Sequence, residues 1–329
     1  MRMFHRELTL IFYLAAVLVS AEIGCPSPEN VEPCECDPTE NIRFPIMTLT
    51  CAKINDSGVL LKVFENTMRY YFTTFALVES HLSYIPHMIL DDVKVIILSL
   101  HNVTLKYMFD EAPTDDTFLK ELKAVKVKVL AGWDWKQLAG FKQLEQLDIL
   151  DTPLKKLPAD FRSSVSKRLR GLSLKNCSIK KLQDDVFADL TVLEQFDLSN
   201  NAIVVIKRTM FPRKANIRNF ILMYNKISTV PSDMFSDMPL LGMVSLRGNM
   251  MAVLSEATFQ PVVMSQLRYL DVTENPIQCD CRIAWVLQER RERISGKCYA
   301  PKALRDKAFN KLTREDIRCS NILLHSLQK

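Results

Sequence analysis

The nine cysteines are the residues of this sequence whose type and spacing could do the most chemistry. Four lie early (Cys25, Cys34, Cys36 and Cys51), four lie late (Cys279, Cys281, Cys298 and Cys319), and Cys177 stands alone between them. In an oxidising compartment, such end clusters form disulfides, although spacing alone leaves their connectivity open. Zinc is the alternative, but structural zinc sites usually use Cys-x2-Cys spacing with histidine, and the five histidines are scattered. We therefore expect disulfides at both ends and no metal site.

The sequence contains none of the common catalytic motifs that were sought. The sequence contains no Gly-x-Ser-x-Gly elbow, no phosphate-binding glycine loop and no His-Glu-x-x-His pair. No serine, histidine and aspartate can be assigned to one pocket from their positions. The sequence thus predicts a protein that is not an enzyme and needs no cofactor.

A 24-residue repeat provides the elements that must position these cysteines. LEQFDLSNNAIVVI begins at Leu193, IRNFILMYNKISTV at Ile217 and LGMVSLRGNMMAVL at Leu241. Their shared frame, L-x-x-L-x-L-x-x-N-x-L-x-x-L, is typical of leucine-rich repeats, whose units stack because none buries its apolar edge alone. Further copies begin at Phe72, Leu144, Leu169 and Leu267, whereas the stretches from about Val95 and from Leu122 fit the frame poorly. We count about nine repeats.

Each copy of the frame predicts a short strand followed by a turn. The paired leucines point into the core, and the asparagine position satisfies buried backbone groups where the chain turns. This position is occupied by Asn201, Asn225, Asn249 and Asn275, by Ser80 in an early copy, and by Cys177 in another. For Cys177 we expect a buried free thiol; a disulfide to a partner chain is the alternative. Phenylalanines 24 residues apart should stack inside the coil, namely Phe187, Phe211, Phe235 and Phe259, with Phe161 one longer repeat before them.

The predicted fold class is α/β, a curved leucine-rich repeat solenoid with a parallel sheet on its concave face and disulfide-bonded caps. Arg2, Arg6 and the short apolar run that follows them are typical of a secretory signal peptide. The expected organisation is a signal peptide (1–21), an N-terminal cysteine-rich cap (22–71), the repeats (72–274) and a C-terminal cysteine-rich cap (275–329). A secreted, extracellular product without a membrane span is expected.

The C-terminal cluster carries the most specific motif. NPIQCDC, ending at Cys281, is followed by Trp285, by CYAP from Cys298 and by Cys319, and it resembles the C-terminal cap of extracellular leucine-rich repeat proteins of the Slit, chondroadherin and Toll type. The resemblance implies the bridges Cys279–Cys298 and Cys281–Cys319. We expect Trp285 to pack a short helix onto the last coil, and we expect Arg290, Arg291 and Arg293 to form that helix's solvated face rather than a heparin site.

The N-terminal cluster resembles the matching cap, but with wider spacing. CPSPENVEPCEC, Cys51 and the later LLKVFENT are similar to secreted arthropod proteins related to the non-catalytic, leucine-rich subunit of the Oplophorus shrimp luciferase. This resemblance implies a non-catalytic accessory or binding protein. It does not imply light emission.

Function is therefore expected at a surface. Outward positions of the later strands gather Ile221, Met223, Tyr224, Met243, Arg247 and Tyr269, an apolar and aromatic set with one arginine, as protein-binding hot spots have. Incidental surface hydrophobics are the alternative interpretation. The expected partner is another extracellular protein. A secreted catalytic subunit as that partner is one alternative, a matrix role is another, and no nucleic acid is expected. Three glycosylation acceptors are predicted at Asn55, Asn102 and Asn176.

Overall fold

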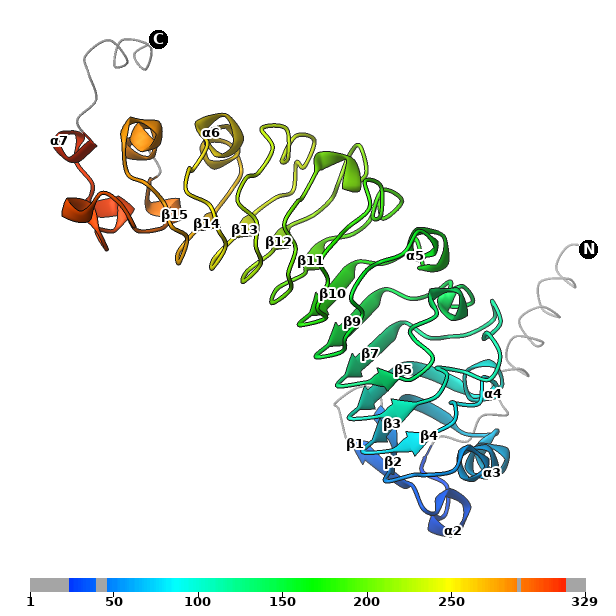
Figure 1. The fold of residues 1–329 in the computed structure, drawn as a ribbon. Coiled ribbons are helices and arrows are strands. Elements are labelled where there is room, and N and C mark those ends of the chain that lie inside the picture. The colour runs from blue at the N-terminus through cyan, green and yellow to red at the C-terminus, as the bar shows by residue number, and fades with distance from the viewer. Residues whose placement is uncertain (1–23, 40–45, 289–290, 318–329) are drawn as a thin grey trace, which may run out of the picture. The chain divides into compact units, whose positions relative to one another are not determined.

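The computed structural model describes residues 24–39, 46–288 and 291–317. The chain divides into two compact units, residues 1–143 (unit 1) and 144–329 (unit 2). The predicted signal peptide, Arg290 and Cys319 lie outside the described residues. Each unit is a stack of coils in which every coil contributes one strand to a common sheet (Figure 1).

Unit 1 contains a five-stranded sheet in the order β1-β2-β3-β5-β7. Strand β1 is antiparallel to β2, and the other neighbours are parallel. Three very short parallel strands, β4, β6 and β8, form a second small sheet. The elements are α2 (Pro28–Val31), β1 (Glu35–Thr39), β2 (Ile46–Ala52), α3 (Ser57–Thr67), β3 (Tyr71–Val78), β4 (His81–Leu82), α4 (Met88–Asp91), β5 (Lys94–His101), β6 (Thr104–Leu105), β7 (Glu121–Val125), β8 (Lys128–Val129) and the 3-10 helix η1 (Trp135–Leu138).

The N-terminal cap is held by two disulfides, Cys25–Cys36 and Cys34–Cys51. Cys51 is fully buried on β2, and Cys36 lies on β1, so both bridges fasten the first segments of unit 1 to its sheet. The fold prediction of a disulfide-bonded cap is confirmed. Sequence spacing had left the pairing open.

Helix α3 returns the chain across the apolar side of this sheet. It begins where the Asp56 carboxylate accepts the backbone N–H of Gly58 at 2.9 Å. Its buried residues, among them Leu60, Val63 and Phe64, recur at helical spacing, which gives the helix one apolar face. The ring of Phe64 meets that of Phe75 on β3 edge-on, with centroids 5.0 Å apart.

The turns of unit 1 depart from the predicted asparagine pattern. Ser80 does take the asparagine position, since its hydroxyl accepts the backbone N–H of Ile54 from the preceding coil at 3.0 Å. The next two coils place the buried valines Val103 and Val127 there. Their turns are satisfied by backbone pairing instead, such as Lys128 N–H to Val103 C=O at 2.9 Å, and this pairing builds the small β4-β6-β8 sheet.

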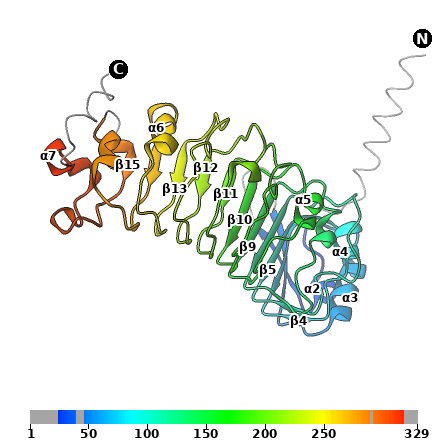
Figure 2. The ribbon, with the colours of Figure 1, turned by 45° about the horizontal axis from the view of Figure 1, so that its top comes forward.

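Unit 2 contains a parallel sheet in the order β9-β10-β11-β12-β13-β14-β15. Its strands line one side of the coils, and α5 and α6 lie on the opposite side (Figures 1 and 2). The elements are β9 (Gln146–Leu150), α5 (Asp160–Ser164), β10 (Gly171–Lys175), β11 (Gln195–Asp197), η2 (Arg208–Met210), β12 (Asn219–Ile221), β13 (Met243–Ser245), α6 (Glu256–Met264), β14 (Tyr269–Asp271), η3 (Cys281–Leu287), η4 (Arg291–Arg293), β15 (Ile294–Ser295), η5 (Lys302–Leu304), η6 (Phe309–Lys311) and α7 (Arg314–Ile317).

The asparagine ladder of unit 2 is confirmed. Each buried amide oxygen accepts a backbone N–H of the preceding coil, as Asn225 does from Ile203 at 3.0 Å. Each amide nitrogen donates to a carbonyl of that coil and to one of its own, Leu198 at 2.9 Å and Leu222 at 3.2 Å in the case of Asn225. The same geometry recurs at Asn201, Asn249 and Asn275. One side chain thus joins two coils.

Cys177 occupies the ladder position of its coil as a free, fully buried thiol. Its Sγ lies 3.3 Å from the carbonyl oxygen of Ile149 and 3.2 Å from that of Lys175, where the other rungs place an amide nitrogen. Burial raises the pKa of this thiol to about 12. The buried position leaves no surface for a disulfide to a partner chain, the alternative considered above.

The predicted phenylalanine column is present, with an addition from the strands. Centroids lie 5.9 Å apart for Phe161–Phe187, 5.6 Å for Phe187–Phe211 and 5.9 Å for Phe235–Phe259. Between Phe211 and Phe235 the contact passes through Phe220 of β12, at 5.5 and 5.8 Å. The aromatic core therefore joins the return segments to the sheet.

The C-terminal cap covers the last coils. Cys279 pairs with Cys298, as the cap resemblance implied, and Cys281 is also disulfide-bonded; its expected pairing with Cys319 falls on a residue that is not described. Trp285 is buried, and its indole N–H donates to the Leu254 carbonyl at 3.1 Å. The prediction that Arg293 belongs to a solvated face is wrong. Its side chain is partly buried, and its guanidinium donates to the Leu267 carbonyl at 2.8 Å.

Candidate protein-binding face

The outward residues of strands β11 to β14 form the face on which the sequence placed a binding patch. Parallel register aligns Gln195, Asn219, Met243 and Tyr269 in one row across the sheet, and Asp197, Ile221, Ser245 and Asp271 in the next. Met223 and Arg247 follow two residues beyond Ile221 and Ser245 on their own coils. Tyr224 lies one residue further, immediately before the ladder position of Asn225.

The aspartates of this face accept hydrogen bonds from their own coils, and Asp197 also pairs with the preceding coil. Asp197 accepts the backbone N–H of Ser199 at 2.9 Å and its hydroxyl at 2.5 Å, and Lys175 pairs with the same carboxylate at 2.8 Å. Asp271 accepts the N–H and hydroxyl of Thr273 in the same way, at 3.0 and 2.6 Å. These hydrogen bonds give Asp197 and Asp271 a structural role. They shape the ends of the strands rather than offering free acceptors.

Tyr224 is the centre of the most organised cluster on this face. Its backbone is left-handed, with φ of 53°, and its side chain remains 39% exposed. The ring lies directly on the backbone of the next coil, because a Cβ added to Gly248 would stand 2.4 Å from the Tyr224 Cδ1. Glycine at position 248, which has no Cβ, therefore leaves the space that the Tyr224 ring occupies.

Arg247 and Glu274 fix the other sides of that ring. The Arg247 guanidinium carbon is 5.7 Å from the ring centroid, and its Nε donates to the Glu274 carboxylate at 3.0 Å. The hydrogen bonds of Arg247, with a further one from Tyr224, lower the pKa of Glu274, and the bond to Glu274 raises the pKa of Arg247. A tyrosine, an arginine and a glutamate are thus held in one exposed, charged and aromatic cluster.

The structure divides the six predicted patch residues into two groups. Met243 and Tyr269 are direct cross-strand neighbours at the start of their strands, and Tyr269 is 38% exposed. Tyr224 and Arg247 form the other group. Asn219 pairs with Met243, and Tyr224 lies five residues after Asn219 along the chain. The two groups are therefore on the order of 15 Å apart along the strand direction. Ile221 and Met223 are half-buried between them.

Sequence reasoning missed Glu274 and Gly248 in this site. Both occupy the position just before a ladder asparagine, where the backbone is left-handed in every coil of unit 2 from β9 to β14. The signal was available: this position favours glycine and asparagine, so a tyrosine or a glutamate there is unusual. The φ of Gly248 is 66° and that of Glu274 is 58°.

The three predicted glycosylation acceptors are all exposed. Asn102 and Asn176 have left-handed backbones, and the Asn176 amide nitrogen donates to Asp151 at 2.8 Å. In the Asn55 sequon, the Ser57 hydroxyl is buried and donates to the Tyr84 carbonyl at 2.7 Å. Their use as acceptors stays a prediction.

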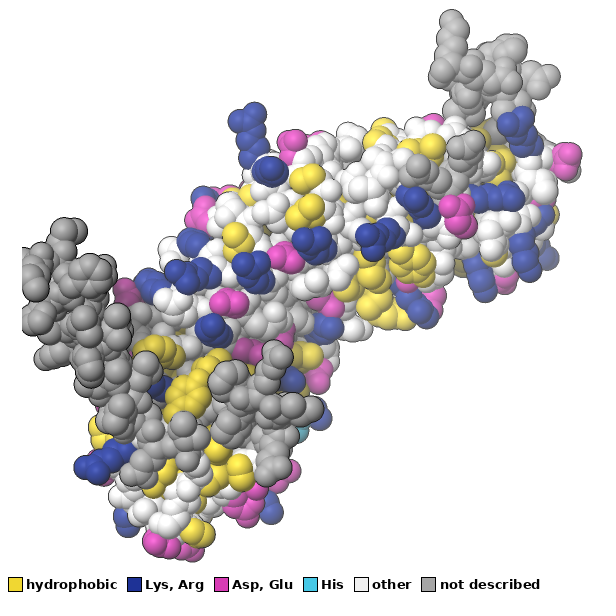
Figure 3. Space-filling view, turned by 180° about the vertical axis from the view of Figure 1, so that it is seen from behind, with side chains coloured by type: hydrophobic (Ala, Val, Ile, Leu, Met, Phe, Trp, Pro, Cys, Tyr) yellow, Lys and Arg dark blue, Asp and Glu magenta, His cyan; other side chains and the backbone are white. Residues whose placement is uncertain are grey.

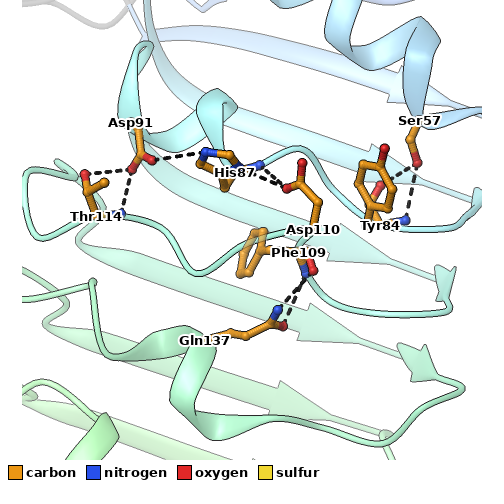
Figure 4. Close-up of polar contacts among 8 residues, drawn as sticks. All are labelled: Ser57, Tyr84, His87, Asp91, Phe109, Asp110, Thr114 and Gln137. Carbon is orange, nitrogen blue, oxygen red and sulfur yellow. Dashed lines mark hydrogen bonds and ion pairs between the residues drawn. The ribbon is translucent and has the colours of Figure 1, made fainter.

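One cluster of polar contacts in unit 1 joins a histidine to two aspartates (Figure 4). His87 lies between Asp110, whose Oδ1 is 3.1 Å from the His87 Nδ1, and Asp91, 4.0 Å from its Nε2. Asp91 also accepts from the backbone and hydroxyl of Thr114, at 2.9 and 3.0 Å. Ser57 is engaged with Tyr84 instead of the histidine. These contacts link successive coils, as does the Gln137 amide that pairs with the backbone of Phe109.

Over the described ranges 24–39, 46–288 and 291–317, no group of three or more histidine, cysteine or acidic side chains is arranged to hold a metal ion. In those same ranges, no helix has both the length and the apolar character needed to cross a bilayer. The face drawn in Figure 3 instead carries lysine and arginine side chains spread among hydrophobic ones along unit 2.

Comparison with known families supports the repeat assignment. Residues 167–213 and 215–277 match the family model described as Leucine rich repeat. Two similar curated proteins are Toll-like receptor 9 of Mus musculus, 27% identical over 177 residues (52% of this chain, 17% of the receptor), and Peroxidasin homolog pxn-2 of Caenorhabditis elegans, 29% identical over 107 residues (30% of this chain, 8% of that protein). The matched stretch spans less than a fifth of either relative.

A solved structure supports the fold. A chain from the octameric complex of Latrophilin 3 (Lec, Olf), Unc5D (Ig, Ig2, TSP1) and FLRT2 (LRR) is similar with a TM-score of 0.60 and 18% identity, covering 90% of this chain and 100% of that one. The α/β leucine-rich repeat solenoid with disulfide-bonded ends is thus confirmed. The narrower resemblance to the group of the shrimp luciferase subunit stays a prediction.

Proposed function

We propose that this leucine-rich repeat chain is a non-catalytic extracellular module that binds another protein through the strand face of unit 2. The contact is centred on Tyr224 and Arg247, with Met243 and Tyr269 as a second apolar contact on the same sheet. The disulfides support an oxidising, extracellular location. The similarity to a chain from an octameric complex of Latrophilin 3, Unc5D and FLRT2 supports a binding role.

The left-handed tyrosine is the observation that carries this proposal. Tyr224 is the one aromatic residue at this position among the coils from β9 to β14, where the others are Asp151, Asn176, Asn200, Gly248 and Glu274. A non-glycine side chain there costs about 1–2 kcal/mol, and aromatic residues gain nothing from the local hydrogen bonds that help asparagine. Backbone stability therefore does not explain Tyr224. An exposed ring braced by arginine is instead the kind of residue that dominates protein interfaces.

The test begins with affinity capture from the native extracellular fluid, followed by mass spectrometry of the bound proteins. Affinity of the captured partner is then measured for Tyr224→Ala and, separately, for Tyr269→Ala. We expect Tyr224→Ala to weaken binding by about 30-fold, the loss of a hot-spot residue. Gly248→Ala should weaken it too, because the new methyl group displaces the Tyr224 ring.

Tyr299→Ala is the matched control. Tyr299 is 54% exposed and also has an arginine over its ring, Arg305 at 4.9 Å, but it belongs to the C-terminal cap. It should leave affinity unchanged. Equal affinity for the parent chain, Tyr224→Ala and Tyr269→Ala would reject the strand face. Capture of one stoichiometric catalytic chain would refine the role to that of an accessory subunit.

A further inference from the structure

A second surface lies on a different side of the unit 2 coils, after the ladder turns. It is a groove of about 660 Å³ between successive coils. Lysines line it, and its apolar lining is contributed by Leu182, Ala202, Val204, Val205 and Met210. The two valines are exposed by 50% and 53%, which is high for adjacent β-branched residues beside a core.

The positive charge beside this groove is concentrated and unneutralised. Lys155 and Lys156 lie on one coil, and Lys180 and Lys181 take the equivalent positions on the next; the backbones of Lys156 and Lys181 pair as neighbours. All four side chains are exposed, and none forms an ion pair with any residue that the structure describes. Coils in parallel register lie about 4.8 Å apart, so the backbones that carry these four lysines lie side by side, and we call the four the lysine block.

Two further lysines flank the valines. Lys207 pairs with Asp184 at 2.8 Å, and Lys226, on the following coil, has no ion-pair partner among the described residues. Asp184 is the only acidic side chain in the lining of the groove. The surface thus consists of an apolar strip bordered by five lysines without carboxylate partners.

We propose that this groove is a docking site for an acidic protein segment that carries apolar side chains between its carboxylates. Several lysines require several anionic groups, so a single carboxylate such as that of a fatty acid would leave most of them unmatched. Covering the two exposed valines requires a ligand with apolar side chains, which a sulfated glycan lacks. An extended acidic-apolar segment satisfies both requirements, because carboxylates reach the lysine block while an apolar residue covers Val204 and Val205.

The probe is a fluorescent octapeptide with a Leu-Phe pair between two runs of three glutamates, compared with octaglutamate and a heparin octasaccharide. Fluorescence anisotropy with the full chain should show tighter binding of the Leu-Phe peptide than of octaglutamate. Replacing the lysine block (K155Q, K156Q, K180Q and K181Q together) should weaken the Leu-Phe peptide on the order of tenfold, the effect of several surface ion pairs. V204S with V205S should reduce its affinity to that of octaglutamate.

The matched control is the replacement of four other exposed lysines (K123Q, K126Q, K297Q and K302Q together), which changes the net charge equally and should leave the affinity unchanged. Far-ultraviolet circular dichroism of each variant confirms that the coils remain folded. Equal loss in the control and in the block variant would overturn the proposal in favour of general charge attraction. Equal binding of both peptides, insensitive to the valines, or tighter binding of heparin would overturn it in favour of a polyanion surface.

Discussion

Removing the Asn225 side chain should destabilise unit 2 by an amount that the ladder geometry determines. In Asn225→Ala, the Leu198 carbonyl keeps the amide of Asn201 at 3.0 Å, and the Leu222 carbonyl keeps that of Asn249 at 2.9 Å. The N–H of Ile203 loses its acceptor and remains buried. One unsatisfied buried donor and the net loss of the remaining bonds together cost about 2–4 kcal/mol.

Urea unfolding followed by tryptophan fluorescence measures this cost as a lower midpoint at an unchanged slope. Asn219→Ala is the control; its amide pairs with Gln195 at the exposed surface, so we expect a change within about 0.5 kcal/mol. A cost below about 0.5 kcal/mol for Asn225→Ala would refute the ladder argument.

Three further predictions follow from single contacts. Cys177 should resist thiol reagents at neutral pH until the chain unfolds, and rapid labelling of the native protein would contradict this. Because the pKa of the folded thiol is raised to about 12, the stability that it contributes is present below its unfolded pKa of about 8.5 and is lost as pH rises toward 12. Arg247→Ala should raise the pKa of Glu274 toward its ordinary value, as measured by NMR titration of the carboxyl group, and an unchanged pKa would disprove the pairing. Since the pKa of Glu274 is lowered in the folded chain, the pair stabilises the fold above the unfolded pKa, and this contribution is lost as pH falls through the folded pKa. Trp285→Ala should lower the free energy of unfolding by about 3–5 kcal/mol, because a buried indole that donates to Leu254 is lost, whereas Tyr299→Ala should change it little.

The sequence predicted those positions at which only one structural role suits the residue type. The ladder asparagines had to satisfy backbone groups at a turn, and phenylalanines at the repeat spacing had to stack. Both expectations hold in detail at Asn225 and at the Phe187–Phe211 contact. The turns of the early coils were harder to predict, because Val103 and Val127 replace the polar ladder residue. Backbone groups there form the hydrogen bonds instead, so no polar side chain marks these turns in the sequence.

The binding face was predicted only in part for a different reason. Alternation along a strand identifies which residues point outward, and Tyr224, Arg247 and Tyr269 do so. It does not provide positions across strands, so two groups about 15 Å apart were read as one patch. Glu274 was missed because it lies one coil further, and its contact with Arg247 exists only once the coils are stacked. The groove with Val204 likewise arises only from neighbouring coils.

The central claim, that a protein partner contacts the strand face at Tyr224, is tested most directly by site-specific photo-crosslinking. A benzoylphenylalanine is placed at position 224, and in a control chain at position 264, where Met264 is exposed on the helix side of the coils. Incubation with native extracellular fluid should give one discrete covalent product from position 224 and none from position 264. A product from position 264 with none from position 224 would contradict the account.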